Sequence, residues 1–492
     1  MAPPESTAVA TLREIVANPV RTPAATGRSS LSVGTAARAV RGVAARDWVA
    51  PLGEAVLITS HLLLRTLDFD APLLWWLVAA VVTALVSPTS GLVVLAAIAP
   101  LEDVFVDGFG LRAFGFKPLL LGAVLAGIVV RSVLDQRNLV RPRMPIILAG
   151  IVLAGTGAGL VVSWYRFGGQ FARLAAYAWA LGIATALVTF VCAAWVARRG
   201  QKRPMIVALG SAAAAGILSL VSYLAPEEFR VSAFGWMAIA PPGERLVELA
   251  RSPTSAAALI MVPATFLLAA AALGANLRLR LGALAASVPL LLVAYLTYTR
   301  TVYVALFATA VIVAWRIRRG LGIGVLVVGL ALAIAIAPAY IRMRADALGG
   351  VATPRPGEQL IASDAQRINA WLTSIRMTMA APLTGHGYRS YRQVGSQYGA
   401  EPAVNAPHNE WLRLFGENGI FTGLAGLGFA ATTFAALARR RDWLGTAILS
   451  SFASIVLAAC FNNPFLYNQV MIPSFVVAGT GLALARGAFR PP

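Results

Sequence analysis

Long apolar runs dominate this chain. Runs of about 16 to 25 residues recur almost from one end to the other, and a run of roughly 20 apolar residues crosses a bilayer as an α-helix. Only 13% of the 492 residues are charged, whereas an ordinary soluble domain carries about 25%. A water-soluble fold could not cover its surface with so few charges, so the sequence predicts an all-α polytopic membrane protein.

The apolar runs set the expected number of membrane spans at about 12–14. Pro72, Pro88 and Pro100 interrupt the first three runs, and a re-entrant hairpin there would lower the count. The fourteen predicted spans cover residues 50–64, 71–87, 91–105, 114–130, 145–163, 174–197, 204–224, 254–275, 281–299, 301–315, 321–341, 412–438, 442–461 and 468–486.

The net charge of +20 raises the question of nucleic-acid binding, and the positions of the basic residues answer it. They lie in short clusters between apolar runs, the pattern of loops that stay in the cytoplasm. We therefore expect the lipid bilayer and no nucleic acid as a partner, with both termini in the cytoplasm. The clusters are Arg131, Arg137, Arg141 and Arg143; Arg198, Arg199, Lys202 and Arg203; Arg316, Arg318 and Arg319; and Arg439, Arg440 and Arg441.

Residues 1–49 are rich in alanine, serine, threonine and arginine, and no compact apolar stretch near the start resembles a signal peptide. We predict a disordered basic cytoplasmic tail. Cys192 and Cys460 both fall inside apolar runs and are expected to be buried thiols.

Residues 342–411 form the longest interruption between apolar runs, and a 70-residue insertion in such a chain is typical of a functional segment. By the span count it is extracytoplasmic, yet it holds more arginines than acids, which predicts an anionic ligand. A helix is expected over Ser363–Met379. The domains are then a tail at 1–49, transmembrane helices at 50–341, an extracytoplasmic catalytic loop at 342–411 and transmembrane helices at 412–492.

Three histidines limit the search for an acid–base group. His61 lies in the first apolar run and is expected to pack against another helix. His386 lies in a Gly-His-Gly turn, whose geometry depends on the glycines. His408 opens a membrane helix beside the arginine-rich loop, and histidine is the side chain best suited to proton transfer near neutral pH.

The stretch from His408 and Asn409, through nine residues to Gly419 and then Thr422, resembles the signature of the O-antigen ligase and polymerase family. The segment upstream is similar to a second family element. It has Arg367 and Trp371, followed by the Pro-Leu-Thr-Gly-His-Gly run that contains Gly385 and Gly387. Thr299-Arg300 resembles the family's Ser-Arg pair before a span. The likeness covers roughly residues 280–440 and implies a GT-C-like glycosyltransferase architecture.

One departure concerns the loop arginine. Arg344–Leu348 matches the family's Arg-x3-Leu element literally, whereas Arg367 has the right downstream context but Trp371 in place of leucine. We favour Arg367 as catalytic and keep Arg344 as a second candidate. Glu417 is interpreted as a residue of a polar network.

The resemblance implies transfer of an undecaprenyl-diphosphate-linked glycan to a glycan or lipid acceptor at the outer face of the bacterial cytoplasmic (inner) membrane. We expect metal-independent inverting attack, in which His408 is the base, Arg367 and Arg300 hold the diphosphate, and Arg344, Asn409 and Arg389 bind substrate. Gly385, Gly387, Gly419 and Thr422 are structural. No outward Asp-x-Asp pair or histidine cluster is present, so neither a metal nor another cofactor is expected.

Several alternatives stay open. The acceptor decides between a ligase, a polymerase and a protein glycosyltransferase. A transporter or flippase for glycan lipids or small solutes would place ionisable residues in mid-span, whereas here they gather at one face. A cell-wall glycan polymerase of the shape and division type would rely on an outward aspartate such as Asp364.

Overall fold

A computed structural model of the chain describes residues 50–64, 70–105, 116–134, 143–224, 253–297, 299–348, 356–401, 404, 406–464 and 467–485. The chain divides into two units, Met1–Leu52 and Gly53–Pro492, and the fold reported below is that of the second unit. The predicted tail at 1–49 and almost all of residues 225–253 lie outside the described residues.

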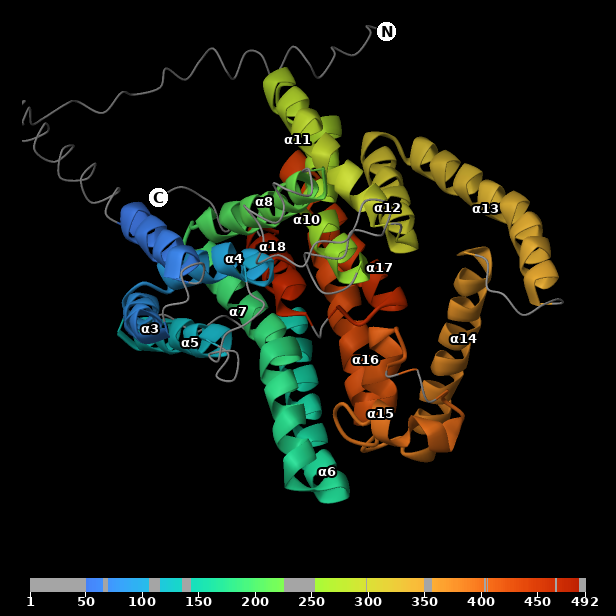
Figure 1. Ribbon diagram of the computed structural model, residues 1–492. Coiled ribbons are helices and arrows are strands. Elements are labelled where there is room, and N and C mark those ends of the chain that lie inside the picture. The colour runs from blue at the N-terminus through green and yellow to red at the C-terminus, as the bar shows by residue number, and fades with distance from the viewer. Residues whose placement is uncertain are drawn as a thin grey trace, which may run out of the picture. The chain divides into compact units, whose positions relative to one another are not determined.

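Helices make up all the regular structure of the described residues (Figure 1). In addition to the apolar helix Ala50–Leu64, they are α3 (Asp70–Val86), α4 (Pro88–Phe105), α5 (Phe116–Leu134), α6 (Met144–Trp179), the π-helix η2 (Ala180–Ala184), α7 (Thr185–Arg198), α8 (Arg203–Leu224), α10 (Pro253–Leu273), α11 (Leu277–Leu296), α12 (Arg300–Ile317), α13 (Arg319–Leu348), α14 (Pro356–Ala380), α15 (Tyr391–Val394), the 3₁₀-helix η3 (Gly395–Tyr398), α16 (Glu410–Ala438), α17 (Trp443–Phe461) and α18 (Asn468–Leu484).

Within the described residues, eight helical stretches are long and apolar enough to cross a membrane, and five shorter apolar helices accompany them. Each of the fourteen predicted spans coincides with one of these stretches, and the 55-residue stretch Met144–Arg198 contains two of them. The prediction of an all-α polytopic membrane protein is confirmed.

α6 is a helical hairpin that turns at Gly168. Gly168 has φ 82° and ψ 173° inside the helix, a conformation open essentially only to glycine. Trp179 donates a hydrogen bond from Nε1 to Oγ1 of Thr156 over 2.9 Å, although these residues would lie about 34 Å apart in a straight helix. The two limbs therefore run side by side (Figure 1).

α16 reverses in the same way at Gly419, whose φ is 82° and ψ 172°. A Cβ on Gly426 would lie 2.8 Å from Leu414, which a straight helix would hold about 18 Å away. The prediction that His408 opens the membrane helix of span 412–438 directly was therefore wrong, because the chain reverses at Gly419. A short limb, Glu410–Asn418, folds back against the long limb that ends at Ala438.

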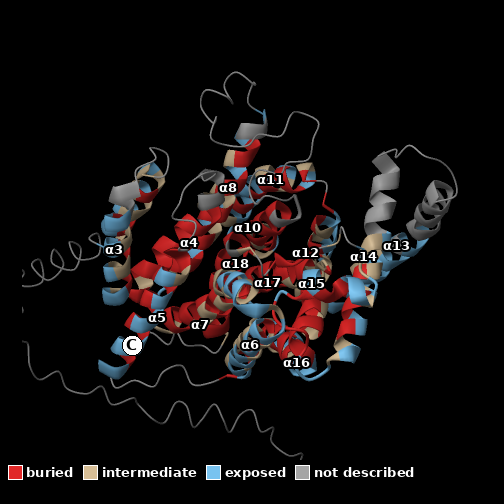
Figure 2. Cartoon of the chain, turned by 60° about the horizontal axis from the view of Figure 1, so that its bottom comes forward, coloured by how far each residue is buried: buried red, intermediate tan, exposed pale blue. Residues whose placement is uncertain are grey.

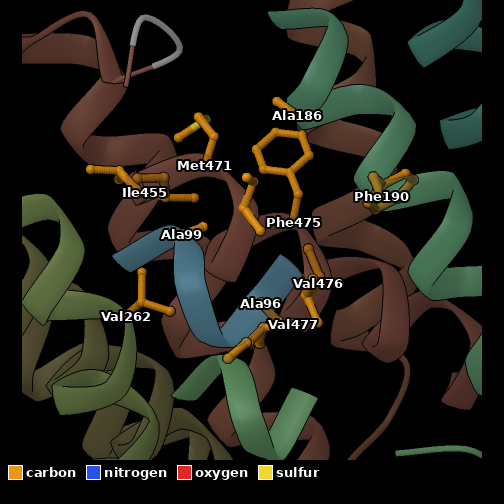
Figure 3. Packing of buried hydrophobic residues seen from close by; sticks show 14 of the residues in the cluster. Ala96, Ala99, Ala186, Phe190, Val262, Ile455, Met471, Phe475, Val476 and Val477 are labelled. Atoms are coloured by element: carbon orange, nitrogen blue, oxygen red, sulfur yellow. The ribbon is translucent and has the colours of Figure 1, made fainter. Parts of the chain in front are cut away.

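The core lies between α4, α7, α10, α17 and α18, where buried residues concentrate (Figure 2). Because lipid is as apolar as leucine, membrane helices gain most from close backbone approach and from hydrogen bonds. A Cβ on Gly479 would lie 2.3 Å from the carbonyl oxygen of Phe190, so α18 contacts α7 directly. Phe190 packs edge-on against Phe475 (Figure 3).

The helix bundle has two distinct ends. At the first, called the arginine end, Arg143 Nη1 donates to the carbonyl oxygen of Leu482 over 2.6 Å. At the same end Arg316 Nη2 donates to that of Ala438 over 2.7 Å. The opposite end, called the loop end, contains the turns at Gly168 and Gly419. α12 runs from the loop end to the arginine end.

Two helices differ in extent from the predicted ones. α13 continues to Leu348, beyond the predicted end of this span at residue 341, so Arg344 lies on this helix. α14 begins at Pro356, seven residues before the expected start at Ser363, and ends at Ala380.

Candidate functional site

The turn at Gly419 frees backbone groups of α16, and the loop after α14 bonds to them. The carbonyl oxygens of Gly416 and Glu417 accept from the backbone N–H groups of His386 (3.3 Å) and Gly387 (2.8 Å). On the other side of the turn, the N–H of Ile420 donates to the carbonyl oxygen of Pro382 over 2.7 Å. Backbone groups of α16 that lose their helical partners at the turn are thus satisfied by hydrogen bonds with the backbone of the loop.

Three motif glycines make this contact possible, and each has a positive φ. A Cβ on Gly385 would lie 2.3 Å from the carbonyl oxygen of Glu417, and one on Gly419 would lie 2.3 Å from that of Leu383. A Cβ on Gly387 would lie 2.5 Å from Oγ of Ser163 in α6. Side chains at these three positions would push the loop away from α6 and α16.

Thr422, the last position of the motif, lies where α16 meets α6. A Cβ on Gly155 would lie 2.2 Å from Thr422 Oγ1, and one on Gly159 would lie 2.3 Å from Asn418 Oδ1. Gly155 and Gly159 are four residues apart, the spacing that lets two membrane helices approach closely. The peptide N–H of Tyr388 also donates to the carbonyl oxygen of Gly159, over 3.0 Å.

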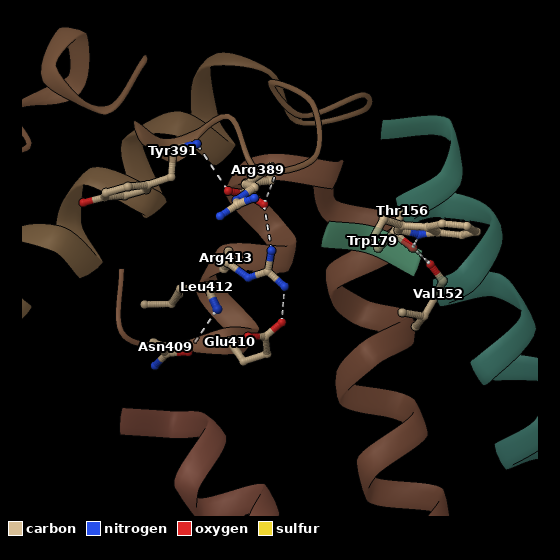
Figure 4. Close-up of polar contacts among 10 residues, drawn as sticks. Val152, Thr156, Trp179, Arg389, Tyr391, Asn409, Glu410, Leu412 and Arg413 are labelled. Carbon is tan, nitrogen blue, oxygen red and sulfur yellow. Dashed lines mark hydrogen bonds and ion pairs between the residues drawn. The ribbon is translucent and has the colours of Figure 1, made fainter. Parts of the chain in front are cut away.

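A buried ion network joins the short limb of α16 to the loop (Figure 4). Arg413 forms salt bridges with Glu410 and, over 3.0 Å, with Glu417, and all three side chains are buried. The Glu417 carboxylate also accepts from the peptide N–H groups of Arg389 (2.8 Å) and Tyr391 (3.2 Å). These contacts fix the loop backbone on the helix.

The network relates to one interpretation made from the sequence and to two residues that the sequence analysis did not identify. Glu417 has the polar-network role that the sequence favoured, with its carboxylate engaged in ion pairing and in hydrogen bonds to the peptide backbone. Sequence reasoning missed Glu410 and Arg413, although the spacing of three and four residues on one helix face was a visible signal.

His386 connects three elements. Its Nδ1 lies 2.8 Å from Arg166 Nη1, and its Nε2 lies 3.1 Å from the carbonyl oxygen of Met377 in α14. Because a guanidinium only donates and a carbonyl only accepts, Nδ1 is the acceptor and Nε2 carries the proton. Burial, with a smaller contribution from the Arg166 charge, lowers the pKa of His386. This imidazole is a neutral structural link.

His61 is also structural, as the sequence favoured. It is buried, and its ring packs between Trp76 (4.3 Å between ring centroids) and Phe116 (5.1 Å).

His408 stands immediately before the first turn of α16. Its φ is 50°, and the next residue, Asn409, caps the helix by accepting from the N–H of Leu412 at 3.0 Å. Asn409, expected to bind substrate, is thus engaged through Oδ1 in holding the start of the helix. Burial and the nearby Arg367 guanidinium both lower the pKa of His408. Its imidazole is therefore held neutral near pH 7.

The end of α17 brings His408 and Arg367 together. Trp411, three residues after His408, lies beside Cys460. Trp371, one turn after Arg367 on α14, has its ring centroid 6.4 Å from that of Phe461. Both tryptophans therefore contact the last turn of α17, which agrees with the electrostatic effect of Arg367 on His408.

The other candidate arginines occupy different positions. Arg300 is the exposed first residue of α12, at the loop end of the bundle. Arg389 is exposed with φ 66°, and its peptide N–H bonds Glu417. The side chain of Arg344 lies outside the described residues.

No group of three His, Cys, Asp or Glu side chains that could hold a metal ion occurs in the part of the chain that the structure describes.

Comparison with known proteins was made by sequence. Residues 285–427 match the family model described as O-antigen ligase, which agrees with the likeness inferred over residues 280–440. The match supports glycan transfer of the O-antigen ligase and polymerase type. No curated protein matches the chain.

Proposed function

From the O-antigen ligase domain at residues 285–427, we propose that this protein transfers a glycan from a polyprenyl diphosphate to an acceptor hydroxyl at the extracytoplasmic membrane face. The proposal is supported by the proximity of Arg367 to the buried His408 imidazole, whose pKa burial and this guanidinium both lower, and by the contacts of Trp411 and Trp371 with the last turn of α17. In the proposed mechanism, His408 as base and Arg367 as diphosphate-binding cation act on one reacting centre.

The residues divide the chemistry between them. The neutral His408 imidazole removes the proton of the acceptor hydroxyl as the hydroxyl oxygen attacks the anomeric carbon of the donor. The bond from that carbon to the phosphate oxygen breaks, and the polyprenyl diphosphate leaves with the bonding electrons. Arg367 and Arg300 bind its oxygens, since guanidinium groups pair with phosphate through parallel hydrogen bonds. Attack opposite the leaving group inverts the configuration.

Substitution of the base tests this mechanism. In His408→Ala, glycan transfer to the acceptor is expected to fall about 10²- to 10⁴-fold, the usual contribution of a general base. The assay incubates purified protein with lipid-diphosphate glycan and competing acceptors, and identifies the product that grows. Donor binding and the amount of protein in the membrane are expected to hold, and full activity in the variant would refute the role of His408.

The same assay separates the alternatives. A flippase would move the glycan lipid between leaflets without forming a new glycosidic bond. In a polymerase of the shape and division type, Asp364→Asn would abolish transfer while His408→Ala would leave it intact. Our proposal requires the opposite pair of results. The product also identifies the acceptor, as lipid A core, another lipid-linked unit, or a serine or threonine side chain.

A further inference from the structure

A cavity of about 500 Å³ opens at the arginine end, opposite the proposed catalytic site. It lies between the last turns of α12, the start of α13, the end of α16 and the first part of α17. Cavities of this size accommodate small ligands.

Four arginines are among the residues that line this cavity, namely Arg316, Arg318, Arg319 and Arg441. None of its lining residues is acidic. Arg441 repels Arg316 electrostatically, whereas the Asp442 carboxylate attracts it, so these charged groups lie close to one another. The lining of the cavity therefore carries an excess of positive charge.

The nearby carboxylate is already engaged. Asp442 accepts from Arg440 Nε (2.6 Å) and Nη2 (2.5 Å). Its Oδ1 also accepts from the peptide N–H of Gly445 at 2.9 Å and so caps α17. This acid bonds Arg440 and the helix end and also attracts Arg316. One carboxylate does not balance the four lining arginines, so an external anion would complement the remaining positive charge.

The rest of the lining is apolar and continues along the bundle. Val311 and Trp315 line the cavity from α12, and Val304, two turns earlier on the same face, is exposed. Phe434 lines it from α16, and Leu427, two turns earlier, is also exposed. Large apolar side chains exposed along membrane helices face lipid, so an acyl chain can extend from the cavity over these two faces.

We propose that the cavity lined by Arg316, Arg318, Arg319 and Arg441 binds the phosphate of an anionic phospholipid whose acyl chains lie on α12 and α16. A basic pocket between membrane helices is a common site for anionic headgroups. Trp315 lines the cavity and is 46% exposed. Tryptophan side chains are enriched at the boundary between headgroups and acyl chains. This site is independent of the proposed glycan transfer.

Lipid binding is tested on the full chain in detergent. Short-chain phosphatidylglycerol is titrated while thermal unfolding and native mass spectra are recorded, for wild type and for the double variant Arg318→Gln/Arg319→Gln. These two arginines are chosen because Arg316 bonds the end of α16 and its loss could unfold the site. Affinity of the variant is expected to fall roughly 30-fold, from two surface cations at about 1 kcal/mol each.

Matched controls separate the sources of binding. Arg278→Gln/Arg439→Gln removes equal charge from exposed positions outside the cavity lining and should retain wild-type affinity. Phosphatidylcholine, glycerol phosphate and inorganic phosphate should each stabilise the wild type far less than phosphatidylglycerol. Equal affinity of the two double variants would overturn the proposal, and so would stabilisation by free phosphate equal to that by the lipid.

Discussion

Within the described residues, His408 and Arg389 are the two non-glycine residues with a positive φ. Such a backbone costs of order 1–3 kcal/mol and persists where the surrounding contacts determine it. The contacts here are the Asn409 cap after His408 and the Glu417 carboxylate on the N–H of Arg389. Both strained residues were candidates from the sequence, although their backbone conformation could not be read from it.

In the proposed mechanism, Arg367 and His408 also determine the pH dependence of catalysis. Burial and the Arg367 charge hold the pKa of His408 below its usual value, so the base loses its neutral form only as pH falls below about 6.5. In Arg367→Gln the positive neighbour is gone and protonation becomes easier. The acid limb of the kcat/KM profile is therefore expected to move to higher pH, towards 6.5.

The charge-retaining variant is the control for this shift. Arg367→Lys should leave the acid limb where the wild type has it, even though the rate falls with the loss of bidentate phosphate binding. If the limb of Arg367→Gln coincided with that of the wild type, the electrostatic pairing of the two residues would be ruled out.

At the scale of elements, the turn of α16 is the feature that sequence reasoning could not supply. Hydropathy records an apolar run but not the direction of its helix, and residues 412–438 read as one span. Gly419 was identified as a motif position, yet only its φ of 82° reveals a reversal. The short limb, with Glu410, Arg413 and Glu417, consequently meets the loop rather than another span.

The buried network predicts a large effect of a single substitution. Arg413→Met leaves the Glu410 and Glu417 carboxylates buried without their cation, which typically costs about 3–5 kcal/mol. The expected result is a marked fall in the thermal unfolding midpoint, measured in detergent, because the loop loses its anchor on α16.

An exposed ion pair in the same chain provides the control. Arg440 and Asp442 bond each other near the surface, where such pairs contribute about 0–1 kcal/mol, so Arg440→Met should shift the midpoint little. Equal shifts in the two variants would contradict a structural role for the network. Replacing Arg413, Glu410 and Glu417 together by apolar or amide side chains should recover part of the thermal stability that Arg413→Met loses.

For the molecule as a whole, the sequence indicated the helices and the arginine clusters between them. Arg316 at one end of α12 and Arg300 at the other are separated by about 24 Å of helix, close to the roughly 30 Å thickness of the bilayer core. Which residues meet at each end was beyond reach, because the contacts of Trp371 and Trp411 with α17 depend on tertiary packing.

This separation predicts opposite exposure of the two ends across the membrane. In a Cys192→Ala/Cys460→Ala background, Gln393→Cys on α15 is expected to react with a membrane-impermeant maleimide added to intact cells. Arg439→Cys, at the arginine end, should react only after the membrane is opened, because clustered basic loops stay in the cytoplasm. Both positions are exposed, so burial does not explain a difference. Labelling of Arg439→Cys in intact cells, with Gln393→Cys protected, would place the Arg367–His408 pair on the cytoplasmic side and exclude transfer at the outer face.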